Sequence, residues 1–304
     1  MIIKMSLARS RRRGRSAQPC ARRTFLAALF VLVIVIGSAA PASTRQMTIG
    51  PEKGWLVLHG GTKKQEYEAL HRFADLAGGP RASVVVIVTP IDLEILTPEF
   101  LSQYGQWWRR ELGVGSVTFM DTRSRDVAGT EAFVAPLRAA TGVWITGGHN
   151  NTLVDVYVGT LTEREIRAVA ERGGVVGGSS AGAMIQGSFL ITRSASATGV
   201  TSSRNLDQTR LAGFGLLKDI TVFPHLAQRR ADKMMADIVA HYPNLLGIGI
   251  DENTAIVVHD DQFEVIGEGH VGVFEARKGA PKTHLTLSPG QRFDLRTHAA
   301  IRSR

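Results

Sequence analysis

The feature that most constrains the fold is an alternation of short apolar runs with longer amphipathic stretches. Residues 83–89 (Ser-Val-Val-Val-Ile-Val-Thr) form a continuous apolar run, typical of a parallel strand that is buried on both faces. Just before it, Leu70, Phe73 and Leu76 recur at helical spacing. Because parallel strands need crossover connections, the alternation predicts an α/β fold with a mostly parallel sheet flanked by helices.

The alternation extends from residue 55 to residue 176, and the pattern of apolar and polar residues then changes. We expect strands at 55–59, 83–89, 117–120, 142–146 and 174–176. We expect helices near 67–76, 100–112 and 132–140, and another that begins near 162. From residue 220 onward the pattern is mostly β, with one helix near 228–240 and short runs at 247–251, 255–258, 263–266 and 271–274. These short runs predict C-terminal β-hairpins at the sheet edge.

The first 42 residues have the three parts of an export signal: an Arg-rich start, an apolar run over 25–36 and small residues before Ala42. Arg22 and Arg23 precede Thr-Phe-Leu, a pattern similar to twin-arginine signals. We interpret 1–42 as an export signal, cleaved after Ala42, that delivers the protein to the periplasm or the medium. An uncleaved membrane anchor is the alternative. Residues 43–53 form a linker and 54–304 a single α/β domain.

The charge balance argues against nucleic acid as a partner. The net charge of +9 falls to +1 when the eight cations of residues 1–42 are set aside. The remaining chain shows no basic face with interleaved aromatic residues. Contact with a membrane is expected only through the export signal. Cys20 is the only cysteine and precedes the cleavage site, so a nucleophile in the mature chain must be oxygen or nitrogen.

A glycine-lined turn follows the strand expected at 174–176. Residues 178–182 (Gly-Ser-Ser-Ala-Gly) fit G-x-S-x-G, with Ser180 at the centre and a helical stretch behind it. Such an elbow exposes a nucleophile at the start of a helix, and the amide of Ala181 would donate to an oxyanion. Ser179 is a second candidate for the nucleophilic hydroxyl. The alternative to a nucleophile elbow is an ordinary Gly-Ser turn without a catalytic role.

A second glycine turn, Gly147-Gly148, ends the preceding strand. The carboxyl ends of parallel strands lie at one edge of a sheet, so we expect this turn beside Ser180. Gly147 or Gly148 could supply the second oxyanion donor. Phosphate binding is the competing interpretation, but neither turn completes a phosphate-binding fingerprint.

A serine nucleophile needs a base oriented by a carboxylate. His225 ends the apolar run 220–223, although a lone histidine is more often structural. Glu252 follows the run 247–251, and neighbouring strand residues point to opposite faces, so only one of Asp251 and Glu252 can serve the site. The order Ser, His, Glu differs from the Ser, acid, His order of α/β-hydrolase esterases.

Over residues 55–295 the chain resembles the cyanophycinase and dipeptidase E family of serine peptidases. The resemblance implies a flavodoxin-like fold similar to that of class I glutamine amidotransferases. It implies Ser180 as nucleophile, His225 as base, Glu252 as orienting acid, and Gly148 with Ala181 as the oxyanion hole. The motifs that carry it are Gly60-Gly61, Leu76-Ala77-Gly78-Gly79, Thr146-Gly147-Gly148, Gly178 to Ala183, Gly247 to Ala255, Phe263 to Gly267 and Pro289 to Leu295.

The sequence departs from cyanophycinases where substrate is bound. Those enzymes carry Asp-Gln before the catalytic histidine, where this chain has Phe223-Pro224. They also carry Asp-Gln after the paired glycines, where this chain has His149-Asn150. Asn150 is therefore a candidate substrate-binding residue. Arg229, four residues after His225, could bind a substrate carboxylate, with Arg230 as the weaker candidate and a solvated helix face as the alternative.

The sequence thus predicts an exported serine peptidase that cleaves small aspartyl peptides or isopeptides through an acyl-enzyme. A catalytically silent exported peptide-binding protein is the rival hypothesis. We expect no cofactor, and no metal site because no H-E-x-x-H or similar ligand cluster is present. An amidotransferase-like enzyme would need a cysteine nucleophile. The scissile bond and the oligomeric state stay open, with a homodimer as one candidate.

Overall fold

The computed structural model describes residues 48–62, 68–191, 210–276 and 283–302, all within the compact unit Gln46–Arg304. The export signal predicted for residues 1–42 lies outside the described residues. Across the described ranges, none of the helices combines the length and apolarity needed to span a membrane. Residues 48–53, predicted as part of a linker, bond to the domain: Ile49 N donates to Asp261 Oδ1 over 2.7 Å, and Gly50 N donates to the Asp260 carbonyl over 3.0 Å.

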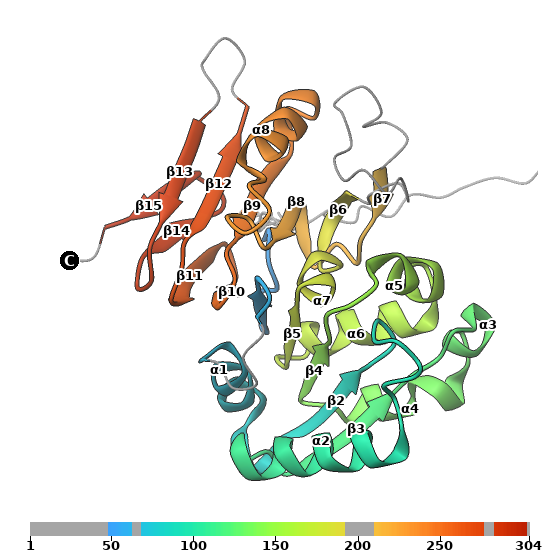
Figure 1. Ribbon diagram of the computed structural model, residues 1–304. Helices are drawn as coiled ribbons and strands as arrows, with labels where there is room; N and C mark the ends of the chain where they lie inside the picture. Colours follow the sequence, from blue (N-terminus) through green and yellow to red (C-terminus); the bar gives the residue numbers. More distant parts are fainter. Residues whose placement is uncertain (1–47, 63–67, 192–209, 277–282, 303–304) are drawn as a thin grey trace, which may run out of the picture. The chain divides into compact units, whose positions relative to one another are not determined.

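The described chain forms helices and strands in the order shown in Figure 1. The helices are α1 Glu68–Ala77, the 3₁₀ turn η1 Gly79–Arg81, α2 Pro98–Glu111, α3 Arg125–Ala128, α4 Glu131–Ala139, α5 Asn150–Tyr157, α6 Leu161–Glu171, α7 Ala181–Met184 and α8 Asp232–His241. The first strands are β1 Trp55–His59, β2 Ser83–Ile87, β3 Ser116–Met120, β4 Gly142–Ile145, β5 Val175–Ser179, β6 Gly187–Ile191, β7 Arg210–Ala212 and β8 Leu217–Pro224. The remaining strands are β9 Leu246–Ile250, β10 Thr254–His259, β11 Gln262–Gly267, β12 Val271–Glu275, β13 Thr283–Leu287, β14 Arg292–Asp294 and β15 Ala299–Ile301.

The larger sheet of the described chain has nine strands in the order β15-β14-β11-β10-β1-β5-β4-β2-β3. The half from β1 to β3 is parallel. The half from β10 to β15 is antiparallel, and β10 also runs antiparallel to β1. The carboxyl ends of β1, β4 and β5 therefore meet at one edge, where ligands bind in sheets of this kind.

The second sheet has six described strands in the order β13-β12-β9-β8-β6-β7, which cross the upper part of Figure 1. Its central strands β6, β8 and β9 are parallel, and β7, β12 and β13 are antiparallel to their neighbours. Strands β9 and β10 follow each other in sequence but belong to different sheets. The short segment 251–253 therefore carries the chain from one sheet to the other.

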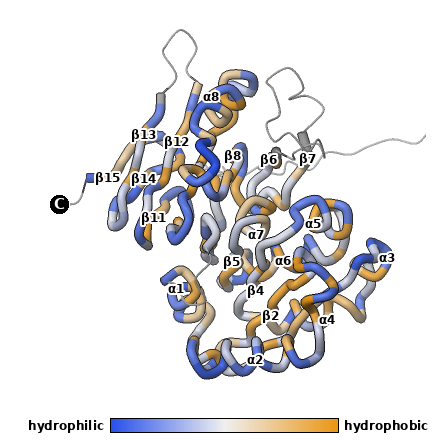
Figure 2. The backbone as a smooth tube through the Cα atoms, viewed as in Figure 1, coloured by the Kyte–Doolittle hydropathy of each residue, from blue (hydrophilic) through white to orange (hydrophobic). Residues whose placement is uncertain are grey.

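Helices cover both faces of the parallel strands, and alternate side chains decide which face each residue meets. In β1, Leu56 and Leu58 belong to a core that α4, α5 and α6 help to form, whereas Val57 packs into a core formed with α1 and α2. The first core also includes Ile248 of β9, so the two sheets pack together. Figure 2 shows that β2 is hydrophobic along its length, as expected for a strand buried on both faces.

The predicted α/β class, with parallel strands flanked by helices, is confirmed. The C-terminal hairpins are present as adjacent antiparallel pairs, such as β10 with β11. The expectation that all the C-terminal strands lie at one sheet edge is wrong, because β9 and β12 belong to the second sheet. The cause is packing: Gly247 and Gly249 let Met235 and Leu226 approach the β9 backbone closely, which local alternation cannot reveal.

Candidate active site

Ser180 lies on a strained turn between β5 and α7. Its φ of 52° and ψ of −113° place a non-glycine residue in a sparsely populated region, as expected for a nucleophile elbow. The amide of Ser180 donates to the His59 carbonyl over 3.0 Å, which ties the turn to the end of β1. The turn therefore holds the hydroxyl at the carboxyl edge of the parallel strands.

The glycines around Ser180 are required by close backbone contacts. A Cβ on Gly182 would lie 2.0 Å from the Ile145 carbonyl oxygen, and one on Gly178 would lie 2.4 Å from the carbonyl carbon of Gly182. Both contacts are shorter than real Cβ atoms tolerate, and the atoms met are backbone atoms that cannot turn aside. The G-x-S-x-G pattern is thus explained by sterics at both glycines.

His225 follows β8 and faces Ser180. Its Nε2 lies 2.8 Å from Ser180 Oγ, and its Nδ1 lies 2.8 Å from Glu252 Oε1. A carboxylate can only accept, so Nδ1 carries the proton toward Glu252 and Nε2 accepts from the serine hydroxyl. His225 N donates to the Gly60 carbonyl over 3.0 Å, and a Cβ on Gly61 would lie 2.2 Å from His225 Cε1. The glycine pair after β1 therefore leaves room for the imidazole.

Asp251 and Glu252 serve different purposes, as their opposite directions on the chain predict. Glu252 contacts His225, and its own amide donates to Gln228 Oε1 over 3.1 Å. Asp251 is buried, and its two oxygens accept from the amides of Ala227 and His270 over 3.0 Å each. Asp251 therefore fixes the segment after His225, and Glu252 is the carboxylate of the site.

The electrostatics keep His225 neutral near pH 7. Burial lowers the pKa of His225 most strongly, the hydrogen bond that His225 donates to Glu252 opposes that effect, and the positive charge of Arg229 lowers the pKa further. A neutral imidazole is the form that can accept a proton from serine. His225 can therefore act as a base near pH 7 without first losing a proton.

Gly148 and Ala181 flank Ser180 as the sequence predicted. Gly148 has a φ of 135°, and a Cβ there would lie 2.1 Å from the Pro90 carbonyl oxygen, so only glycine fits. A Cβ on the preceding Gly147 would lie 3.2 Å from Ser180 Cβ, which places the Gly147-Gly148 turn directly beside the nucleophile. Ala181 begins α7, and the first amides of a helix have no intrahelical acceptor.

His59 is a site residue that the sequence did not reveal. It is buried at the end of β1 beside Ser179, and its Nδ1 lies 3.1 Å from Ser179 Oγ and 3.2 Å from Gly61 N. Burial lowers the pKa of His59 to about 3, with a smaller contribution from His225. His59 therefore stays neutral and connects the nucleophile turn to the glycine pair under His225. Its position at a strand end was the available signal.

Ser180 and His225 open into a pocket of about 710 Å³. Gly61, Thr62, Gly147, Gly148 and Ser179 contribute to its lining near the nucleophile. The rest of the lining comes from helices α1 and α2, from β4 and from the residue that follows β4, and consists of Leu70, Phe100, Gln103, Tyr104, Trp107, Trp144 and Thr146. None of these residues was predicted as a site residue, although Phe100, Tyr104 and Trp107 recur at helical spacing.

The two predicted substrate-binding residues lie outside that pocket lining. Asn150 begins α5, and its Nδ2 lies 3.9 Å from Met184 Sδ. Arg229 is exposed, and its guanidinium lies 5.9 Å from the ring centroid of Phe223. Its amide donates to the His225 carbonyl over 2.9 Å, so a hydrogen-bonded turn places Arg229 four residues after the base. In the described part of the chain, no group of three or more His, Cys, Asp or Glu could hold a metal ion.

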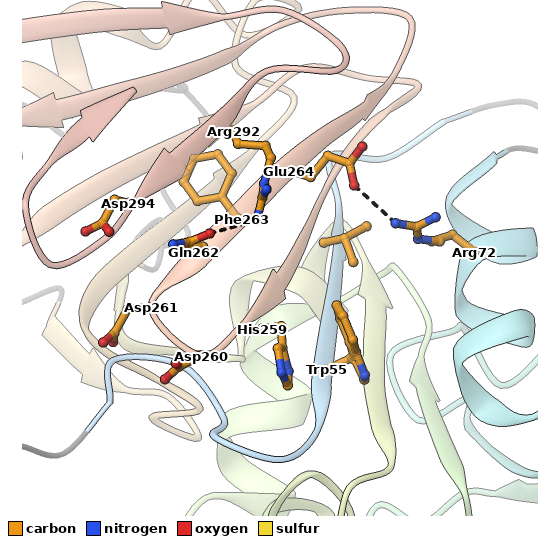
Figure 3. A pocket seen from close by; sticks show the side chains of 11 residues that line it. Trp55, Arg72, His259, Asp260, Asp261, Gln262, Phe263, Glu264, Arg292 and Asp294 are labelled. Carbon is orange, nitrogen blue, oxygen red and sulfur yellow. Dashed lines mark hydrogen bonds and ion pairs between the residues drawn. The ribbon is translucent and has the colours of Figure 1, made fainter. Parts of the chain in front are cut away.

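A second pocket, of about 630 Å³, lies at the other end of β1 (Figure 3). Trp55 at the start of β1 stacks on His259 there, with 4.2 Å between the ring centroids. Arg72 pairs with Glu264 over 3.1 Å across it. This pocket contains none of the residues that surround Ser180, so the candidate active site is confined to the carboxyl edge of the parallel strands.

The fold and the hydrogen-bonded serine, histidine and glutamate define the class as an α/β serine hydrolase. The family model of Peptidase family S51 matches residues 56–266. The chain is 28% identical over 250 residues to the cyanophycinase of Geminocystis herdmanii (strain PCC 6308), covering 80% of this chain and 89% of that protein. It is 31% identical over 225 residues to the cyanophycinase of Nostoc sp. (strain PCC 7120 / SAG 25.82 / UTEX 2576), covering 72% of each.

The chain belongs to peptidase family S51 and is a serine-type peptidase. The resemblance to the cyanophycinase and dipeptidase E family is thereby confirmed. A crystal structure of a peptidase from an acI-B1 Actinobacterium superposes with a TM-score of 0.61 at 23% identity, covering 81% of this chain and 98% of that one. This similarity shows that the two proteins share a fold.

Proposed function

We propose that the protein hydrolyses peptide bonds through an acyl-enzyme, with Ser180, His225 and Glu252 as its catalytic triad. The observation that carries the proposal is the continuous hydrogen-bonded chain, with 2.8 Å from Ser180 Oγ to His225 Nε2 and 2.8 Å from His225 Nδ1 to Glu252 Oε1. This is the arrangement by which an oriented base activates a serine hydroxyl.

In the acylation half, His225 Nε2 takes the hydroxyl proton while Ser180 Oγ bonds to the substrate carbonyl carbon. The carbonyl oxygen becomes an oxyanion that accepts from the amides of Gly148 and Ala181. The resulting imidazolium, stabilised by Glu252, gives its proton to the leaving nitrogen as the C–N bond breaks. Preorganised donors of this kind each contribute roughly 10²- to 10³-fold to the rate.

In the deacylation half, His225 takes a proton from water while the water oxygen bonds to the ester carbonyl carbon. The second oxyanion uses the same two amides. The ester C–O bond breaks, and His225 returns its proton to Ser180 Oγ. The free acid leaves, and the neutral imidazole that burial favours is restored.

For the substrate, we propose small aspartyl peptides or isopeptides. The support is the membership in a family whose relatives include cyanophycinases, together with Arg229, a cation whose amide donates to the His225 carbonyl. A guanidinium can bind a carboxylate through two hydrogen bonds. Digestion of matched α-linked and β-linked aspartyl peptides, compared between wild type and Arg229→Gln, tests this part. An unchanged KM for both linkages in the variant contradicts it.

We propose that residues 1–42 direct export and are removed after Ala42. The support is their composition, with eight cations, no acid, an apolar run and a closing Ala-Pro-Ala. The test is to express the full chain, fractionate the cells and determine the N-terminus of the exported protein. We expect it to begin at Ser43, and Arg22→Lys with Arg23→Lys to abolish export. Retention of the full-length chain inside the cell contradicts the proposal.

The catalytic proposal is tested with a serine-directed phosphonate probe on the purified mature protein. We expect one covalent adduct on Ser180, no adduct in Ser180→Ala, and a retained adduct in the matched control Ser179→Ala. Hydrolysis of a peptide panel is measured in parallel. Full turnover by Ser180→Ala contradicts the triad, and ligand retention without turnover by the wild type favours the silent peptide-binding alternative.

A further inference from the structure

The pocket that holds Ser180 and His225 has one wall made of aromatic side chains. Phe100, Tyr104 and Trp107, hereafter the aromatic wall, come from α2 and line the same pocket as the glycine turns. Their spacing of four and three residues places them on one face of the helix. Each is partly exposed, whereas the adjacent Trp108 is fully buried in the core. The wall is therefore a surface presented to the pocket, supported by the core behind it.

The rings of the aromatic wall are held by one another. Tyr104 stacks on Trp107 with 6.0 Å between centroids and an interplanar angle of 24°. On its other side Tyr104 stacks on Phe119 of β3 at 5.6 Å and 23°, and its ring lies 5.6 Å from that of Phe100. Rings fixed in this way present a flat apolar surface at little cost in side-chain entropy.

The described residues that line the pocket offer the aromatic wall almost no charge. Among the described residues that line the pocket, His225 is the only one with a side chain that ionises near neutral pH, and burial lowers its pKa. Burial also raises the pKa of Tyr104, so its hydroxyl stays protonated. A charged substrate side chain placed here would lose hydration without gaining an ionic partner among the described lining residues, which is unfavourable. An aromatic or large aliphatic side chain would gain contact area.

The size of the pocket limits what can be bound. Its volume of about 710 Å³ falls within the range of roughly 300 to 1,000 Å³ that holds small ligands. Leu70 and Trp144 close its inner side and are both almost completely buried. A short peptide with one bulky side chain fits this space, and the same space contains the nucleophile.

We infer that the substrate carries an aromatic or large aliphatic residue beside the scissile bond and that this side chain packs on the aromatic wall. The inference rests on the proposed peptidase function and extends it. A carboxylate near Arg229 and an apolar side chain on the wall are compatible, because one residue on each side of the scissile bond can satisfy both. The preferred substrates are then short aspartyl peptides whose second residue is apolar.

The inference is tested with a series of aspartyl peptides, α-linked and β-linked, whose second residue is Phe, Leu, Ala or Arg. We expect kcat/KM for the Phe member to exceed that for the Arg member by at least about 10-fold. Trp107→Ala should remove most of this preference, mainly through KM, while changing the Ala member less than about threefold. Trp107→Phe should retain the preference. Gln106→Ala, on the exposed side of α2, is the matched control and should match wild type.

The outcomes separate the inference from the proposed function. Labelling of Ser180 and hydrolysis with equal or greater kcat/KM for the Arg member overturns the inference and keeps the peptidase mechanism. An equal loss on every substrate in Trp107→Ala, with unchanged melting temperature, also overturns it. If no peptide is hydrolysed and Ser180 forms no adduct, the proposed function fails and the inference fails with it.

Discussion

The candidate triad is assembled from two halves that are held in different ways. The nucleophile half, Ser180 with the glycine turns around it, follows strands of the nine-stranded sheet and is positioned by backbone atoms in tight contact. The base half, His225 and Glu252, follows strands of the second sheet and is positioned by side-chain hydrogen bonds. Sterics fix the first half, and polar contacts fix the second.

The two halves should therefore respond differently to substitution. A substitution that adds atoms to a glycine of the nucleophile half should damage the fold before it damages the chemistry, because the added Cβ meets backbone that cannot move. A substitution in the base half should damage the rate and spare the fold, because a changed hydrogen bond reorients an imidazole without creating a clash. The four predictions below test this contrast.

The largest effect is expected for Glu252→Gln in the base half. The amide no longer stabilises the imidazolium or holds the tautomer with Nδ1–H, so we expect kcat to fall on the order of 10³-fold. The melting temperature should stay within a few degrees of wild type, measured by differential scanning fluorimetry. Near-normal kcat would remove Glu252 from the triad, and a large loss of melting temperature would break the contrast between the halves.

Gly182→Ala in the nucleophile half should instead lower stability. Its Cβ would lie 2.0 Å from the Ile145 carbonyl oxygen, and relieving such an overlap costs about 2 to 3 kcal/mol of unfolding free energy. Gly129→Ala is the matched control, because Gly129 is exposed with a φ of −86°. Urea unfolding of both variants measures the difference. Equal stability of the two variants would show that the turn can relax.

His59→Gln tests the nucleophile half through pH. The unfolded chain protonates His59 below about pH 6.5, whereas the folded chain resists protonation until a pKa of about 3, so the neutral histidine contributes stability that is lost as pH falls. Between pH 6.5 and pH 5 this contribution decreases by about 1 to 2 kcal/mol. Urea unfolding at both pH values should show a smaller decrease in His59→Gln than in wild type. Identical decreases in the two proteins would contradict a buried neutral His59.

The smallest effect is expected for Arg229→Gln. The positive charge of Arg229 helps to lower the pKa of His225, so its removal should move the acid limb of the kcat/KM profile to higher pH. In wild type that limb should lie below pH 6.5, because burial lowers the pKa of His225. Arg230→Gln serves as the control on a neighbouring exposed cation. A limb that does not move in Arg229→Gln would place Arg229 too far from the base to affect it.

Much of the nucleophile half is visible in the sequence because its determinants are local. The strand before Ser180 and the glycines at 178 and 182 are adjacent in the chain, and the structure gives each glycine a steric reason. The base half was predicted from weaker signals, a histidine and a glutamate at strand ends. They were useful because strand ends meet at one edge of a parallel sheet.

Other parts could not be predicted from local pattern. The runs at 247–251 and 255–258, which become β9 and β10, were predicted as strands of one sheet edge. In the structure β9 pairs with β8 and β12, whereas β10 pairs with β1 and β11. A strand's pattern shows which residues alternate, and it does not show which strand becomes its partner. The pairing depends on segments that are distant in the sequence, such as β1, whose Leu56 pairs with Val258 of β10.

The sequence by itself determined the α/β class and the serine elbow, since these follow from residue periodicity and from a short glycine-lined motif. It offered His225 and either Asp251 or Glu252 as base and acid from their positions at strand ends, and the resemblance to the family implied Glu252. Only the tertiary structure decided how two sheets share the candidate triad, how buried His59 contacts the turn, and that Phe100, Tyr104 and Trp107 line the same pocket as Ser180. These features depend on packing between segments far apart in the chain, because which surfaces a helix and a strand bury against each other is set by the whole fold.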